Sequence, residues 1–127
     1  MFNAQPVAMA AMLATLMPEL FATIEARGRR LMDSIRDELA AADHKAVVTG
    51  WPQVSHFAFD PDAPARNWRD LANMNRAKYV KFCVALLADG VRALERGACF
   101  MSAAHDDAIV DETLEAPRRA AREVPAT

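Results

Sequence analysis

Hydrophobic positions in the first third of the chain recur every three or four residues, which predicts helix. Two segments share this pattern, residues 6–17 and 19–42, and Pro18 between them is expected to kink the helix or to start a new one. Pro6 suits a first helical turn, because its missing N–H would have no partner there. Gly28 lies inside the second segment, where glycine costs about 1 kcal/mol against alanine, so we expect close packing against a neighbouring element.

Short extended runs follow these helices. Residues 46–49 and 53–59 predict two strands joined at Gly50, and residues 60–67 form a loop rich in proline and aspartate. Helical spacing returns from about Trp68 or Asp70 and stops at Gly90, the usual residue just past a helix end. The apolar stripe of this helix comprises Leu71, Met74, Tyr79, Phe82 and Leu86, widened by Val80, Val84 and Leu87.

The last third of the chain predicts two more extended segments and one helix. Residues 91–94 form a brief strand and residues 98–102 a third one, and Asp106 or Asp107 can cap the helix that follows. Pro117 is expected to break or bend that helix. The order of elements predicts an α+β fold, in which a small, mostly antiparallel sheet of about three strands is covered by helices.

Composition narrows the function classes. The 127 residues correspond to about one domain, and 15 basic against 17 acidic residues give a net charge of −2, with arginines interleaved among acids, so no nucleic-acid partner is expected. No run approaches the ~18 apolar residues of a membrane span, and no early Lys or Arg marks a signal peptide. Cys83 and Cys99 form no CxxC pair, so we expect buried thiols and a cytoplasmic, reducing setting.

No motif of a self-contained active site is present. The sequence lacks a phosphate-binding loop and a nucleophile elbow, and His44, His56 and His105 do not pair at metal-ligand spacing, so no metal site is predicted. Ser102, His105 and Asp106 together suggest a catalytic triad, but triads are assembled in space and not along the sequence. A turn followed by an Asp-capped helix explains the same residues, with His105 as a hydrogen-bonding group in the turn.

Three segments carry a family pattern: FNAQPVAMAA at residues 2–11, VTGWPQVSHFAF at 48–59, and LADGV at 87–91 followed by FMSAAHDDAIVDETL at 100–114. In this order they resemble class III pyridoxal-phosphate (PLP)-dependent aminotransferases, and most closely their glutamate-1-semialdehyde aminomutase-like branch. The chain departs from the family pattern at Met1, where the family has a phosphate-contacting Thr, and at Gln5, where it has Asn. It departs again at Asp106, often Thr in the family, and at Pro117, in a helix that the family continues.

The resemblance implies a place within a larger enzyme. Residues 1–17 would be a helix leading from a large domain, and residues 18–127 the C-terminal small domain of a fold-type I enzyme. Asn3 would lie near the cofactor phosphate, and Ser102 and His105 on the substrate side. The lysine that holds PLP would lie upstream of this chain, because Lys45 follows a helix, while Lys78 and Lys81 are expected to face solvent.

Two hypotheses follow. In the first, the chain is a domain or fragment of a PLP-dependent aminotransferase, part of a homodimer or other homo-oligomer, and inactive alone with no catalytic residue and no bound cofactor of its own. In the second, it is a non-catalytic interaction module that self-associates or docks to a separate large domain through Val7, Met9, Met12, Leu13 and Leu16.

Overall fold

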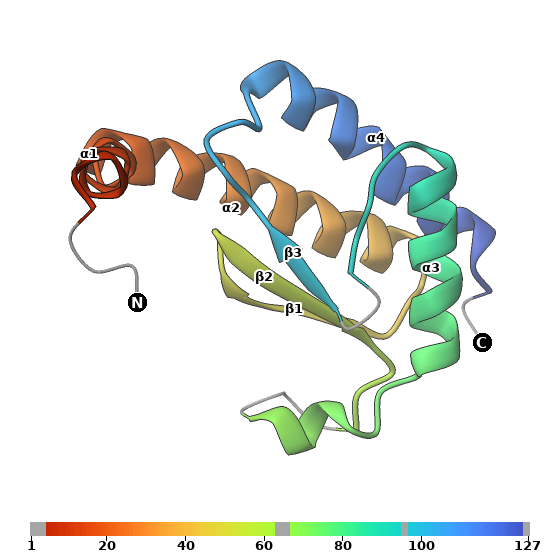
Figure 1. The fold of residues 1–127 in the computed structure, drawn as a ribbon. Coiled ribbons are helices and arrows are strands. Elements are labelled where there is room, and N and C mark those ends of the chain that lie inside the picture. Colours follow the sequence, from red (N-terminus) through yellow and green to blue (C-terminus); the bar gives the residue numbers. More distant parts are fainter. Residues whose placement is uncertain (1–4, 63–66, 95–96, 126–127) are drawn as a thin grey trace.

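The architecture is helical, with one small sheet at its centre. The computed structural model describes residues 5–62, 67–94 and 97–125. In these ranges the elements follow the order α1, α2, β1, β2, a short 3₁₀ helix, α3, β3 and α4 (Figure 1). The predicted α+β class, an antiparallel sheet covered by helices, is confirmed.

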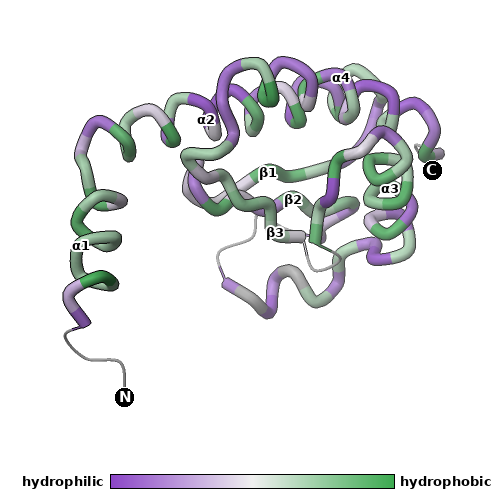
Figure 2. The backbone as a smooth tube through the Cα atoms, turned by 45° about the horizontal axis from the view of Figure 1, so that its top comes forward, coloured by the Kyte–Doolittle hydropathy of each residue, from purple (hydrophilic) through white to green (hydrophobic). Residues whose placement is uncertain are grey.

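The two N-terminal helices are α1 (Pro6–Thr15) and α2 (Pro18–Ala41), and each begins at a proline. Their axes differ by 53°, so Pro18 starts a new helix, as one of the two sequence expectations has it. Helix α1 contains no buried residue and extends away from the other elements (Figure 2). Among the described residues no single helix is long and apolar enough to cross a membrane; only the bent α1–α2 pair meets that criterion, by length and composition alone.

The sheet contains three antiparallel strands with β2 at its centre. Strand β1 (Ala46–Trp51) pairs with β2 (Val54–Phe59), and β2 pairs with β3 (Ala98–Phe100). Strand β1 is two residues longer than predicted, because Gly50 adopts a φ of +101° and continues the pairing into the hairpin. Helices α2 and α3 (Arg76–Ala88) pack on the sheet, and α4 (Asp107–Glu123) packs on both helices.

The core is an aromatic cluster between β2 and α3. Phe57, Phe59, Tyr79 and Phe82 are each at most 1% exposed, with ring centroids 5.0–6.5 Å apart in neighbouring pairs. Burying one such side chain contributes roughly 1.5–3 kcal/mol. The periodicity predicted this stripe correctly for α3, and Leu31, Ile35 and Leu39 of α2 complete it.

The predicted close packing at Gly28 is confirmed. A Cβ atom at this position would lie 2.0 Å from the carbonyl oxygen of Pro52, in the β1–β2 hairpin. Only glycine therefore lets α2 come this close to the hairpin.

Helix α3 begins later than predicted. A separate 3₁₀ helix occupies Trp68–Leu71, and α3 starts at Arg76. Each has its own cap: the Asn67 side chain accepts a hydrogen bond from the Arg69 N–H (2.8 Å), and Asn75 accepts one from the Lys78 N–H (3.0 Å). Two caps give two helix starts, where periodicity alone suggested one.

The orientation of α3 also differs from the prediction. Val80, Val84 and Leu87 do not widen the buried stripe, since they are 38%, 63% and 58% exposed. Lys78, expected to face solvent, is buried. Its Nζ lies 3.5 Å from an Asp60 carboxylate oxygen and 5.5 Å from the centroid of the Phe59 ring, so an ion pair and an aromatic face replace water around the ammonium.

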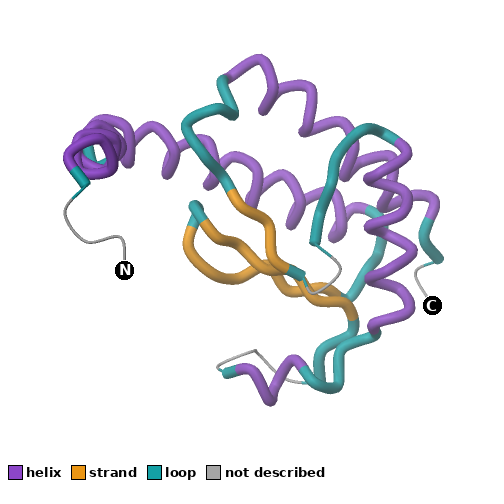
Figure 3. The backbone as a smooth tube through the Cα atoms, viewed as in Figure 1, coloured by secondary structure: helices purple, strands orange, loops and turns teal. Residues whose placement is uncertain are grey.

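Two expectations for the C-terminal third, a strand at residues 91–94 and a helix break at Pro117, were wrong. Residues 91–94 are not a strand (Figure 3). The Tyr79 hydroxyl donates to the Leu94 carbonyl and holds this segment against α3. Helix α4 continues through Pro117. The Pro117 ring is fully buried, and its packing offsets the roughly 3 kcal/mol that an interior proline costs a helix.

Candidate functional site

The turn between β3 and α4 holds the two described residues expected on the substrate side, Ser102 and His105. The Ser102 N–H donates to His105 Nδ1 (3.0 Å), and the His105 N–H donates to the Ser102 carbonyl (3.1 Å). Ser102 Oγ also lies 3.0 Å from Nδ1. The imidazole thus closes its own turn, which supports the interpretation of His105 as a hydrogen-bonding group in the turn.

The two carboxylates next to His105 contradict the triad hypothesis. Asp106 accepts the Ile109 N–H (2.9 Å) and caps α4, as predicted. Asp107 forms a two-pronged ion pair with Arg27 of α2, with both N···O distances at 2.9 Å. A triad needs a carboxylate that orients the histidine, and both acids next to His105 have other partners. The geometry is that of a helix start.

The charges around this helix start join α4 to α2. Arg27 holds the pKa of Asp107 below its usual range, chiefly through their hydrogen bond, and the same bond raises the pKa of Arg27. Arg30 and Asp111 form a second ion pair along the same two helices. This pairing was not predicted from the sequence. Spacing could have indicated it, because Arg27 and Arg30 are three residues apart and Asp107 and Asp111 four apart, so each pair shares a helix face.

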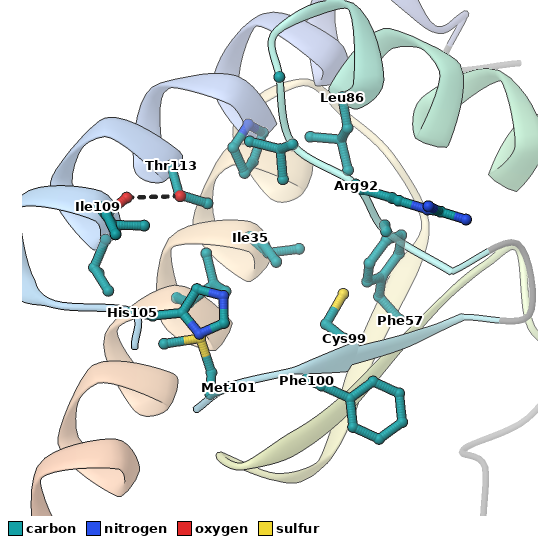
Figure 4. A pocket seen from close by; sticks show the side chains of 16 residues that line it. Ile35, Phe57, Leu86, Arg92, Cys99, Phe100, Met101, His105, Ile109 and Thr113 are labelled. Carbon is teal, nitrogen blue, oxygen red and sulfur yellow. Dashed lines mark hydrogen bonds between the residues drawn. The ribbon is translucent and has the colours of Figure 1, made fainter. Parts of the chain in front are cut away.

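A pocket of about 220 Å³ lies beside this turn (Figure 4). It is lined by residues of α2, β2, α3, β3 and α4, by His105, and by residues 90–93. Burial, aided by the neighbouring Cys83, raises the pKa of Cys99 in this pocket to about 12, so the thiol stays protonated at neutral pH and is a poor nucleophile. Sequence reasoning missed the pocket because its walls come from distant parts of the chain.

The residues that could contact a cofactor are Asn3 and the three lysines. Asn3, expected near the phosphate, lies outside the described residues. Lys78 is buried against Asp60, while Lys45 and Lys81 are exposed and do not line the pocket. None of the three lysines of the chain lines this pocket. Over the described ranges, no cluster of three His, Cys, Asp or Glu side chains could hold a metal ion.

Comparisons with known proteins identify relatives over nearly the whole chain, although no family model matches it. The chain is 27% identical over 128 residues to a glutamate-1-semialdehyde 2,1-aminomutase from Desulfatibacillum aliphaticivorans, and 29% identical over 126 residues to one from Desulforudis audaxviator. These matches cover 96% and 94% of this chain but 30% and 29% of the relatives. The chain therefore spans about 30% of the length of these curated relatives.

Solved structures show the same partial coverage. The PLP internal aldimine form of the Sphingopyxis sp. MTA144 FumI protein is 25% identical, with a TM-score of 0.68, over 86% of this chain and 23% of that one. A transaminase with PLP bound has a TM-score of 0.78 at 23% identity, over 97% of this chain and 28% of its own. An omega-transaminase from Sphaerobacter thermophilus has a TM-score of 0.75 at 22% identity, over 97% and 29%. The resemblance to class III PLP-dependent aminotransferases is confirmed, and the fold matches the transaminase structures.

Proposed function

We propose that the chain forms the C-terminal small domain of a class III PLP-dependent aminotransferase or aminomutase, and that it acts only together with a larger, cofactor-binding part. The supporting observation is the end-to-end match of this chain with relatives about three times as long. Bound PLP supplies the electron sink for amino transfer. In this proposal the small domain closes over the substrate side of the enzyme, in a cytoplasmic setting.

Helix α1 is the proposed contact with the larger part or with a second subunit. No charged residue occurs between Gln5 and Pro18. Val7, Leu13 and Leu16 are 82%, 64% and 51% exposed, and Figure 2 shows the helix as mostly hydrophobic. A helix that is apolar on all sides is normally buried, so α1 is built for surroundings that the described residues do not supply. Asn3 precedes this helix and is proposed to lie near the cofactor phosphate.

The first test concerns activity. The purified 127-residue chain, mixed with PLP and an amino donor and acceptor, is expected to transfer no amino group and to leave the PLP absorbance unchanged. Lys45→Ala and Lys81→Ala variants, at the two exposed lysines, control for nonspecific reaction of surface amines with the PLP aldehyde. Turnover of the amino donor by the chain alone would overturn the proposal that it depends on a larger part.

The second candidate function is a non-catalytic interaction module, and the exposed face of α1 is the observation that favours it. In that case the chain self-associates through α1 in gel filtration. Leu13→Glu would place a charge on this face and give a monomer, whereas Thr15→Glu, about 200° around the same helix, would leave the assembly intact. A wild-type chain that elutes as a monomer and binds no hydrophobic dye contradicts this second function.

A further inference from the structure

The pocket beside the β3–α4 turn has a lining suited to a ligand of its own, independent of amino transfer. Ile35, Phe57, Cys99, Met101 and Ile109 face it from α2, β2, the β3 region and α4 (Figure 4). We propose that this pocket binds a small, neutral, single-ring aromatic molecule.

The volume of the pocket selects the size of the ligand. An apolar cavity of about 150 Å³ stays dry and binds benzene, and this pocket holds about 220 Å³. Pockets for drug-sized ligands start at about 300 Å³, which is more than this one provides. One aromatic ring with a short substituent therefore fits, and a larger ligand does not.

The lining atoms favour an aromatic ring over an aliphatic one. Figure 4 shows the Cys99 sulfur beside the ring of Phe57 and the Met101 sulfur farther along the pocket, next to His105. Sulfur–aromatic contacts and pairs of aromatic rings each stabilise beyond the burial of their area. An aliphatic molecule of equal volume would gain only the burial.

Two polar side chains that line the pocket, Thr113 and His105, already have hydrogen-bond partners and do not require a polar ligand. The Thr113 hydroxyl donates to the Ile109 carbonyl (2.7 Å), and His105 Nδ1 accepts the Ser102 N–H. An apolar ring next to these groups breaks none of their hydrogen bonds, so it does not incur the cost of an unmade one.

The charges around the pocket favour a neutral ligand. Arg92 is the one charged residue in the lining, and Figure 4 shows its guanidinium extending away from Cys99 and Ile35. A carboxylate carried into the pocket would lose its hydration without gaining a buried partner, which is costly. Benzene is therefore expected to bind better than benzoate.

The experiment measures thermal unfolding of the full chain with benzene, cyclohexane or benzoate. Benzene at ten times its Kd is expected to raise Tm by about 5 °C, from the mass-action relation and the unfolding entropy of a chain of this length. Cyclohexane and benzoate are expected to give clearly smaller shifts. Cys99→Phe fills the pocket and should abolish the benzene shift, whereas Val84→Phe adds the same ring on the exposed face of α3 and should leave it unchanged.

A second measurement needs no variant. Intermolecular NOEs from the benzene protons to the Met101 and Ile109 methyl groups should appear in the wild-type chain. The proposal is overturned if these NOEs are absent, if benzoate matches benzene, or if a folded Cys99→Phe variant keeps the benzene shift.

Discussion

Gly28→Ala reverses the usual effect of this substitution in a helix. In an exposed helix interior, alanine for glycine gains about 1 kcal/mol. Here the new Cβ would lie 2.0 Å from the Pro52 oxygen and 2.6 Å from the Pro52 carbonyl carbon. Both are backbone atoms, so no rotamer change relieves the contact and α2 must move away from the hairpin. Overpacking costs about 1–3 kcal/mol, and a contact this short with backbone atoms belongs in the upper part of that range, about 2–3 kcal/mol. After the gain of about 1 kcal/mol from alanine, we expect a net loss of about 1–2 kcal/mol.

Urea unfolding followed by circular dichroism measures this loss directly. Thermal unfolding gives a second readout. The unfolding entropy of 127 residues is about 0.27 kcal/mol/K, so the Tm of the variant should fall by about 4–7 °C. Ala26→Gly at an exposed site of the same helix is the control, and it should destabilise by about 1 kcal/mol through propensity alone. If Gly28→Ala instead stabilises the chain, the close packing of α2 on the hairpin is refuted.

Three further predictions concern charged and titratable groups. Lys78→Met should destabilise the chain by about 1–3 kcal/mol in urea unfolding, because it leaves the Asp60 carboxylate without its buried cation. Arg27→Gln should raise the pKa of Asp107 toward about 3.9 in an NMR titration. Because folding lowers that pKa, the stabilisation is present above about pH 3.9 and is lost as the pH falls through the folded value. Cys99 should react slowly with iodoacetamide at pH 8 and rapidly in urea, by mass spectrometry of its peptide, because burial raises its pKa to about 12.

Each of these has its own control. An Asp60→Asn and Lys78→Met double-mutant cycle should show a coupling energy, and simple additivity of the two changes would contradict the ion pair. Arg30→Gln should raise the pKa of Asp107 less than Arg27→Gln, since Arg30 acts on it only through its charge. Equal labelling of Cys99 in folded and unfolded chain would contradict the raised pKa of this half-buried thiol.

Local chemistry is what the sequence predicted best. Proline at the start of α2, the Asp106 cap of α4 and the existence of strand β2 depend on neighbouring residues, and all three are confirmed. The aromatic stripe of α3 also followed from periodicity, since Tyr79 and Phe82 are fully buried.

The errors arose where distant residues decide the outcome. Lys78 was expected to face solvent because its helix position was judged alone, but Asp60 at the end of β2 pairs with it. Residues 91–94 have the pattern of a strand, yet the Tyr79 hydroxyl binds the Leu94 carbonyl. The substrate-side place of His105 stays a prediction, and its observed bonds lie within its own turn.

The ion pairs between α2 and α4 cannot form until nearly the whole chain has been synthesised. They join residues 80 and 81 positions apart, and contacts of such separation form late. A ribosome adds roughly 5–20 residues per second, so α2 waits several seconds before α4 is synthesised. During that time Leu31, Ile35 and Leu39 have the β1–β2 hairpin beside them but not α4. The nascent chain therefore carries an uncovered apolar face on α2 until α4 has been synthesised.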